Sequence, residues 1–143
     1  MKDGTIQGGV WCPAIMPEAV VALTGASGAR YGVRLVDALL EHDWKVNLIV
    51  TGAGAINLDL ECGISPEELA DRKGVTLEEN RNLAARSASG SARFDAYIIC
   101  PASGTTIGKI SSGISDNLAT RSALVAMKER RKLIIVPREA PYS

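Results

Sequence analysis

The stretch VVALTGASGARYGVRLVDALL, residues 20–40, joins an apolar run to an amphipathic segment through a glycine-rich turn. The run from Ala19 to Leu23 is short and wholly apolar, which is typical of a strand buried on both faces. Apolar residues then recur every three or four positions through residues 28–42 and predict a helix. The small residues of the turn let backbone N–H groups approach an anion, and the helix start adds its positive end. The stretch therefore predicts a strand–turn–helix unit that holds an anionic group.

Further short apolar runs alternate with helical segments along the rest of the chain. Strands are predicted at residues 19–24, 45–51, 96–100 and 133–137, and further helices at 65–71 and 115–132. Ser65 is placed to cap the first of these helices, with Pro66 at its first position. Residues 72–94 are polar and rich in serine and glycine, so we expect a loop or a weak helix there. Strands separated by helices predict an α/β fold, a three-layer αβα sandwich with a parallel sheet of Rossmann-like or flavodoxin-like type.

The length of the chain favours one domain. Its 143 residues are enough to bury a core, and we expect an irregular N-terminal arm over 1–18 followed by a single domain over 19–143. Lysine plus arginine equals aspartate plus glutamate at 16 each, so no net charge attracts nucleic acid or an anionic membrane. No apolar run approaches the length of a membrane span, and the arm lacks the apolar core of a signal peptide.

The cysteines and the histidine argue against several kinds of site. Cys12, Cys62 and Cys100 are odd in number and widely spaced, which indicates reduced thiols in the cytoplasm instead of a disulfide framework or a zinc site. The single histidine, His42, lies among charged residues near a predicted helix end. We therefore expect no metal site and no histidine base, and a hydrolase-type nucleophile at Ser27 lacks its partner.

Four predicted strands end in turns of small, polar or charged residues. The turns are TGASG (24–28), TGAGA (51–55), PASGTT (101–106) and PREAP (137–141). Ligands of parallel sheets bind beyond the carboxyl ends of the strands, so these turns predict a site for a phosphorylated ligand. The first turn lacks the spacing G-x-G-x-x-G of dinucleotide sites and the Gly-Lys-Ser/Thr of a Walker A loop. Taken alone, it is equally compatible with a purely structural role.

Five motifs carry a family resemblance: ALTGASGARYGVRLVDAL, INLDLE, SASGS, IICPAS and GISDNLATRSALVAMKERRKLIIVPREAP. From about residue 19 to residue 141 the chain resembles the UbiX-type flavin prenyltransferases, most specifically in SDNLATR, KERRKL and PRE. The resemblance implies a flavodoxin-like sandwich and a homo-oligomer, often a dodecamer, that binds FMN at subunit contacts. It also implies transfer of a dimethylallyl group from dimethylallyl phosphate to N5 and C6 of reduced FMN. The product would serve a UbiD-type decarboxylase.

The same resemblance implies roles for individual residues. Contacts with FMN are implied for Thr51, for Arg138 and for two groups of small residues, namely Gly25, Ala26 and Ser27, and Ser103, Gly104, Thr105 and Thr106. Catalytic roles near the prenyl group or its phosphate are implied for Glu61, Arg121, Lys128 and Glu139, with Arg138 beside them. Cations stabilise a departing phosphate, and a carboxyl such as Glu139 can carry a proton. Without the resemblance, Arg121 and Lys128 would be expected on a solvated helix face and Glu61 on the surface.

The chain departs from the family pattern at several points. Relatives usually continue through a helix, a strand and a C-terminal helix, so we expect a shortened domain that transfers prenyl groups slowly. Thr105 replaces a family lysine, Ala140 a threonine and Ala92 an aromatic residue. The PAS at 101–103 is shared with FMN-dependent cysteine decarboxylases, although their catalytic histidine has no counterpart. The alternatives are a flavoprotein without prenyl transfer, redox-active or decarboxylase-like, and an FMN-binding or assembly-only fragment.

Overall fold

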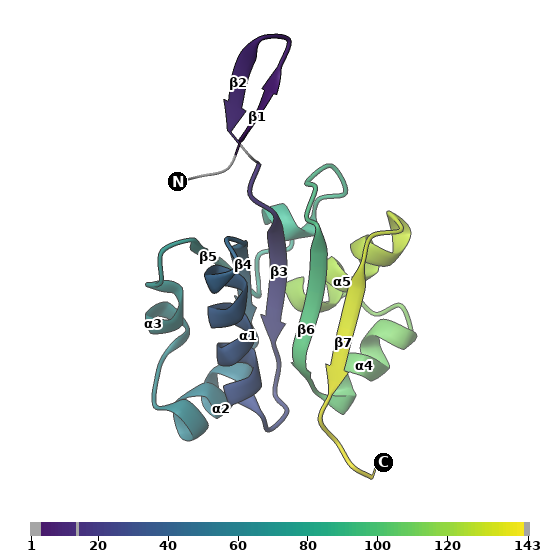
Figure 1. Ribbon diagram of the computed structural model, residues 1–143. Helices are drawn as coiled ribbons and strands as arrows, with labels where there is room; N and C mark the ends of the chain where they lie inside the picture. Colours follow the sequence, from purple (N-terminus) through teal and green to yellow (C-terminus); the bar gives the residue numbers. More distant parts are fainter. Residues whose placement is uncertain (1–3, 14, 142–143) are drawn as a thin grey trace.

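The structure, a computed structural model, describes residues 4–13 and 15–141 and centres on one parallel β-sheet (Figure 1). Its strands are β3 (Glu18–Leu23), β4 (Lys45–Val50), β5 (Val75–Glu79), β6 (Ala96–Ala102) and β7 (Leu133–Pro137). They lie in the order β5-β4-β3-β6-β7, and every neighbouring pair is parallel. The predicted α/β class and the four predicted strands are confirmed, with shifts of one or two residues at some strand ends.

Helices cover both faces of the sheet. On one face lie α1 (Ala29–Glu41), α2 (Gly52–Cys62) and α3 (Pro66–Ala70); on the other lie α4 (Gly104–Ser111), α5 (Leu118–Lys128) and the 3-10 turn η1 (Arg86–Ala88). Along β3, Val20 and Ala22 pack toward α5, while Val21 and Leu23 pack toward α1 and α2. None of these four side chains is more than 1% exposed. Burial on both faces explains why the strand is a continuous apolar run and not an alternating one.

The strand order reverses between the two central strands, β3 and β6. From β3 the chain passes through α1 to β4 and on to β5 at one edge, and it then returns to β6 and continues to β7 at the other. The connections leave β3 and β6 in opposite directions, so a crevice opens beyond the carboxyl ends of these two strands. The first and third of the four turns singled out in the sequence border this crevice.

Several helix starts follow the local sequence. The helix predicted at 28–42 is α1, and the predicted cap of α3 is confirmed, since Ser65 Oγ accepts a hydrogen bond from Glu68 N at 3.1 Å. The helices α2 and α4 were not predicted, because their glycine-rich starts have low intrinsic helix propensity. In the described residues, no helix combines the length and the apolar composition that crossing a membrane requires.

The N-terminal arm is not irregular, which corrects the expectation for residues 1–18. β1 (Gly4–Gln7) and β2 (Val10–Pro13) form an antiparallel hairpin that projects from the sheet domain (Figure 1). Gly8 and Gly9 form its turn with φ of +56° and +80°, and a two-glycine loop between short strands is a hairpin signal. Residues 1–3 and 14 of the arm, and the side chain of Cys12, lie outside the described part of the structure.

The expectation of a loop or weak helix over residues 72–94 is also wrong in part, because this segment contains β5. The strand pairs with β4 from Val46↔Val75 to Val50↔Glu79 and forms one edge of the sheet. Its sequence, VTLEE, has only two apolar residues. An edge strand is partly exposed and can be polar, so a search for continuous apolar runs does not detect it.

Candidate functional site

A cleft of about 650 Å³ lies at the carboxyl edge of the sheet, at the point where the strand order reverses. Three turns line it, one after each of β3, β6 and β7. The lining residues are Gly25, Ala26, Ser27, Ser103, Gly104, Thr105, Arg138 and Glu139. This central cleft therefore brings together most of the residues that the sequence predicted for an FMN site, together with one predicted catalytic acid.

Thr24 fixes two walls of the central cleft against each other. Its hydroxyl donates a hydrogen bond to Pro101 O at 2.6 Å and accepts one from Ser103 N at 2.8 Å. The side chain is 1% exposed, so both bonds are shielded from water. Sequence reasoning missed this residue, and the signal was a threonine placed directly after the buried strand β3. One buried hydroxyl thus sets the spacing of the turns after β3 and β6.

The start of α4 points into the turn that borders the cleft. Ser103 caps the helix, because its Oγ accepts a hydrogen bond from Thr106 N at 3.1 Å and lies 2.8 Å from Thr106 Oγ1. Gly104 and Thr105 form the first turn, where backbone N–H groups have no partner within the helix. Thr106 is buried and does not line the cleft. The helix start, with its exposed first turn, is suited to a phosphate.

The opening glycine turn is shaped by close contacts. A Cβ at Gly25 would lie 2.5 Å from the Cβ of Ala53, so the glycine lets α2 start directly against the turn after β3. Gly28 has a φ of +105°, and a Cβ there would lie 2.8 Å from Arg138 Nε. Thr51 does not line the cleft; its hydroxyl accepts a hydrogen bond from Gly54 N at 3.0 Å and caps α2.

Arg138 and Glu139 follow β7 with exposed side chains. The guanidinium carbon of Arg138 lies 5.0 Å from the centre of the Tyr31 ring, within cation–π distance. Among the described residues Arg138 belongs to no ion pair, so its charge is available to an anionic ligand. A Cβ at Gly104 would lie 3.1 Å from Glu139 Oε2, which places this carboxylate at the start of α4. The sequence prediction did not include Tyr31, which lies in the first turn of α1.

A second cavity, of about 370 Å³, adjoins the central cleft and shares Ser27 and Arg138 with it. The rest of this side cavity is lined by Gly28, Arg30, Tyr31 and Glu61. Both carboxylate oxygens of Glu61 accept a hydrogen bond from Gly28 N, at 3.0 and 3.2 Å, and Oε2 also accepts one from Ala29 N at 3.0 Å. These backbone bonds, from Gly28 first, lower the pKa of Glu61, so the carboxylate is ionised at neutral pH.

Comparison with known proteins identifies the family. Residues 16–141 match the flavoprotein family. The flavin prenyltransferase LpdB of Lactiplantibacillus plantarum is 43% identical over 129 residues, 90% of this chain and 68% of the relative. A crystal structure of AnUbiX in complex with FMN and dimethylallyl pyrophosphate has a TM-score of 0.85 at 34% identity, over 90% of this chain and 68% of that one. A dodecameric FMN-dependent UbiX-like decarboxylase from Escherichia coli O157:H7 has a TM-score of 0.83 at 36% identity, over 88% and 69%.

This chain belongs to the flavoprotein family. Within that family it belongs with the UbiX-type flavin prenyltransferases, as the motifs predicted.

Two predicted catalytic residues of this flavoprotein, Arg121 and Lys128, lie outside the central cleft and the side cavity. Both side chains are exposed on α5. The helix starts near the carboxyl edge of the sheet, where Leu118 N donates to Asn80 O just beyond β5. It runs back toward the amino edge, where β7 then starts (Figure 1). Lys128, the last residue of α5, is therefore at the opposite edge of the sheet from the cleft of its own chain.

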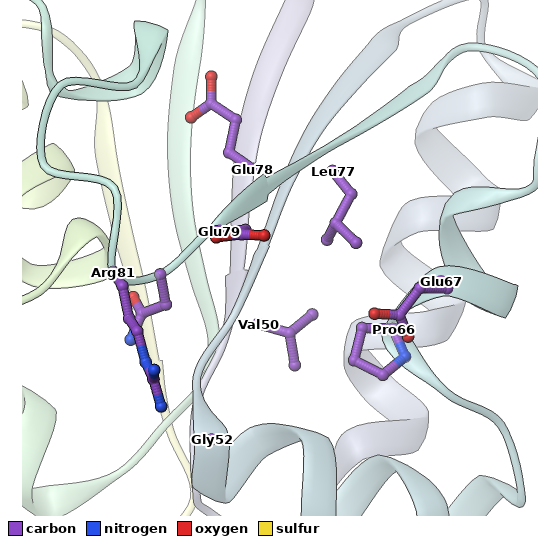
Figure 2. A pocket seen from close by; sticks show the side chains of 9 residues that line it. Val50, Gly52, Pro66, Glu67, Leu77, Glu78, Glu79 and Arg81 are labelled. Atoms are coloured by element: carbon purple, nitrogen blue, oxygen red, sulfur yellow. The ribbon is translucent and has the colours of Figure 1, made fainter.

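A third cavity of the flavoprotein, of about 400 Å³, lies at the β4–β5 side of the carboxyl edge (Figure 2). Val50, Leu77 and Pro66 point into it, with the carboxylates of Glu67 and Glu79 beside them. Glu78 points away in Figure 2, and its Oε2 accepts a hydrogen bond from Ser87 Oγ at 2.5 Å. This edge cavity contains none of the predicted site residues. In the described part of the chain, no three histidine, cysteine or acidic side chains are placed to hold a metal ion.

Proposed function

We propose that this flavoprotein binds FMN in the central cleft and transfers a dimethylallyl group to the reduced flavin from an allylic phosphate ester such as dimethylallyl phosphate. The observation that carries the proposal is the junction of two cavities at Ser27 and Arg138. The central cleft suits the phosphate of FMN, and the side cavity is lined by the guanidinium groups of Arg30 and Arg138. The wall that the two cavities share would lie between FMN and the prenyl donor. Reduced FMN, when bound, supplies the nucleophile. The name of LpdB and the ligands of the AnUbiX crystal structure support the same reaction.

The residues of the central cleft fit FMN. Its volume of about 650 Å³ is in the range of small-molecule sites. The turn after β3 is built of Gly25, Ala26 and Ser27, whose small side chains leave space for a flat ring. The start of α4, with Gly104 and Thr105, offers backbone donors for the flavin phosphate. Thr51 and Thr106 do not line the cleft but support it from behind. Thr51 caps α2 by accepting a hydrogen bond from Gly54 N, and the backbone N–H of Thr106 donates to the capping hydroxyl of Ser103.

The charged residues at the junction have different roles in this proposal. Arg138 stabilises the charge that develops on the departing phosphate. Glu139, exposed beside the start of α4, carries the proton that the phosphate receives or the flavin loses. Glu61 remains ionised and holds the glycine turn by accepting hydrogen bonds from two of its N–H groups. It therefore positions the turn and is not the proton donor at neutral pH.

Lys128, at the opposite edge of the sheet, reaches the reaction only if another copy of the chain supplies it, so the proposal includes a homo-oligomer. Ile56 and Leu60 lie one turn apart on α2 and are 62% and 76% exposed, which offers an apolar surface for assembly. The E. coli relative is described as dodecameric. Sedimentation of the protein at micromolar concentration should give a mass of several chains, and Leu60→Asp should lower that mass. A stable monomer at that concentration would contradict the proposal.

Two further parts of the proposal concern the cell. The prenylated flavin would be delivered to a UbiD-type decarboxylase, because a modified cofactor requires an enzyme that uses it. The cytoplasmic location remains a proposal, supported by the free thiols of Cys62 and Cys100. Co-expression with a UbiD-type enzyme tests the first part: decarboxylase activity should depend on this chain. Cell fractionation tests the second part, and recovery of the protein in the membrane or secreted fraction would overturn it.

The central experiment is an anaerobic assay of the FMN-loaded protein. Calorimetry should first show FMN binding, and dimethylallyl phosphate added to the reduced complex should then give a flavin with a new absorption spectrum. Binding without a new spectrum would favour the second candidate, an FMN-binding protein without prenyl transfer. If the protein does not assemble, Lys128 stays far from the cleft, and an FMN-binding protein without prenyl transfer is then favoured. Dependence of flavin reduction on NAD(P)H would indicate the redox alternative.

A further inference from the structure

We propose that Tyr31 is a positioning residue, whose ring holds the guanidinium of Arg138 over the glycine turn of residues 24–28 and keeps it from pairing with Glu61. The inference rests on the proposed prenyl transfer, in which Arg138 supplies positive charge. Tyr31 was not among the residues predicted from the sequence. It lines the side cavity together with Arg138 and Glu61, and Arg138 also lines the central cleft.

The side chain of Tyr31 stands on a fixed base. Tyr31 is the third residue of α1, and its backbone N donates a hydrogen bond to Gly28 O at 2.9 Å. Gly28 is held in turn by the carboxylate of Glu61, which accepts from Gly28 N. Tyr31 is 58% exposed, and among the described residues its hydroxyl has no hydrogen-bond partner. The ring therefore contributes little to the core, and its face is available to another side chain.

Arg138 lies against this ring and against Gly28. Its guanidinium carbon is 5.0 Å from the centre of the Tyr31 ring. A Cβ at Gly28 would lie 2.8 Å from Arg138 Nε and 3.0 Å from Tyr31 Cδ2, so the glycine leaves the space in which the arginine and the ring meet. An aromatic face attracts a guanidinium without neutralising its charge. The contact therefore fixes where the charge of Arg138 is and leaves it usable.

Glu61 is the competing partner for Arg138. The pKa of Glu61 is lowered first by the backbone hydrogen bond from Gly28, and the nearby charge of Arg138 is among the further causes. The carboxylate is therefore ionised at neutral pH and attracts the cation. Among the described residues, however, no ion pair joins Glu61 to Arg138, although both line the side cavity. An ion pair would neutralise the charge that the proposed reaction needs, and the contact with Tyr31 keeps Arg138 away from it.

A second cation–π contact in the described part of the chain shows the difference between a structural contact and this one. The guanidinium carbon of Arg86 lies 4.6 Å from the centre of the Phe94 ring, and Phe94 is buried. Arg86 also donates to both carboxylate oxygens of Glu18, at 2.6 and 2.8 Å. Its charge is therefore paired, and its contact belongs to the packing of the domain. The contact of Arg138 is exposed and its charge is unpaired, so positioning explains it better than stability does.

The test compares Tyr31→Leu with Tyr31→Phe in the FMN-loaded protein. Leucine keeps an apolar side chain but removes the aromatic face, whereas phenylalanine keeps the face and lacks only the hydroxyl. Tyr31→Leu should lower kcat for prenyl transfer about 3- to 10-fold, the effect of one lost cation–π contact. Phenylalanine at the same position should recover most of the rate that leucine loses. Equal losses in the two variants would overturn the inference.

A double-mutant cycle shows whether the effect of Tyr31 passes through Arg138. In the Arg138→Gln background, Tyr31→Leu should cause no further loss of rate, because the guanidinium that the ring holds is already absent. A general disturbance of α1 by leucine would instead lower the rate of both backgrounds by the same factor. Additive losses would therefore overturn the inference.

Crystal structures of the FMN-loaded wild type and variants separate this inference from the reaction itself. The guanidinium of Arg138 should lie over the glycine turn in the wild type and in Tyr31→Phe. In Tyr31→Leu it should leave this place and approach the carboxylate of Glu61. An unchanged position in Tyr31→Leu would overturn the inference. If the protein transfers no prenyl group, the proposed function fails, and the position of Arg138 in these structures alone then decides the role of Tyr31.

Discussion

The central cleft and the edge cavity lie along the same edge of one parallel sheet, yet their chemistry differs. The central cleft is lined by glycine, alanine, serine and threonine, together with Glu139 and with Arg138, which is in no ion pair among the described residues. The edge cavity has apolar side chains, among them Val50 and Leu77, the carboxylates of Glu67 and Glu79, and the guanidinium of Arg81 (Figure 2). A helix starts beside each cavity, α4 at the first and α2 at the second.

The difference shows that a strand end and a helix start are not sufficient for an anion site. At the edge cavity the helix start is accompanied by the carboxylates of Glu67 and Glu79 and by one guanidinium, that of Arg81, so negative charge predominates and disfavours a phosphate. At the central cleft it is accompanied by one guanidinium and one carboxylate, Arg138 and Glu139, and by turns small enough for close backbone approach. The strand order also reverses only at the central cleft, which leaves room between the connections. Paired substitutions in the two cavities test this comparison.

The largest effect is expected at Glu139. Glu139→Gln removes the proposed proton carrier and should slow prenyl transfer about 10²- to 10³-fold, in the range of general acid–base catalysis. FMN affinity should be retained, because the side chain is exposed and the cleft keeps its shape. The same change at Glu79 in the edge cavity should leave the rate at the wild-type value. Anaerobic kinetics and FMN titration of both variants measure this, and equal losses in the two would refute the assignment of roles.

A smaller effect is expected from filling the central cleft. Ser27 has an exposed side chain at the wall that the central cleft and the side cavity share. An indole there occupies ligand space without disturbing the core, so Ser27→Trp should weaken FMN binding about 100-fold. Glu79→Trp places the same bulk in the edge cavity and should not change FMN affinity. Calorimetry gives both affinities, and tight FMN binding by Ser27→Trp would place the flavin elsewhere.

The smallest effect concerns the stability of the glycine turn. The pKa of Glu61 is lower in the folded protein than its ordinary value of 4.5. Its ionised form therefore stabilises the fold above the unfolded-state pKa, and this contribution is lost as the pH falls through the folded-state pKa. Glu61→Gln should lower the free energy of unfolding by about 0.5–1 kcal/mol at pH 7, the usual range for a charge at a helix start.

The measurement for Glu61 is urea unfolding at pH 7 and at pH 3 to 4. The difference between wild type and Glu61→Gln should shrink toward the acidic end. Glu41→Gln, which breaks an exposed ion pair with Arg34, is the control and should change stability little at either pH. A pH-independent difference for Glu61→Gln would mean that shape, and not charge, gives Glu61 its effect.

The sequence predicted what depends on strong local patterns. The buried strands around residues 20 and 98 have long apolar runs, and the turn of Gly25 to Ser27 follows the first of them directly. The edge strand β5 was not predicted, because it has only two apolar residues. The hairpin of the arm was expected to be irregular, because the loop of Gly8 and Gly9 was not read as a hairpin turn. Thr24 and Tyr31 were missed for another reason: their contacts join segments about 77 and 107 residues apart in the chain. Only the assembled sheet brings such partners together.

The buried hydroxyl of Thr24 also has a consequence for motion. It links the turns after β3 and β6 through two short hydrogen bonds, so we expect these two walls to keep their spacing when a ligand binds. Among the described residues, no comparable hydrogen bond ties the side chains of Arg138 and Glu139 to those walls; Arg138 is restrained by its stacking on Tyr31. We therefore expect adjustment of the site to a ligand to fall to the segment after β7, whose charged side chains have no hydrogen bond to the two turns among the described residues. The two turns of the proposed binding surface are preorganised, and the charges of Arg138 and Glu139 are the part expected to adapt.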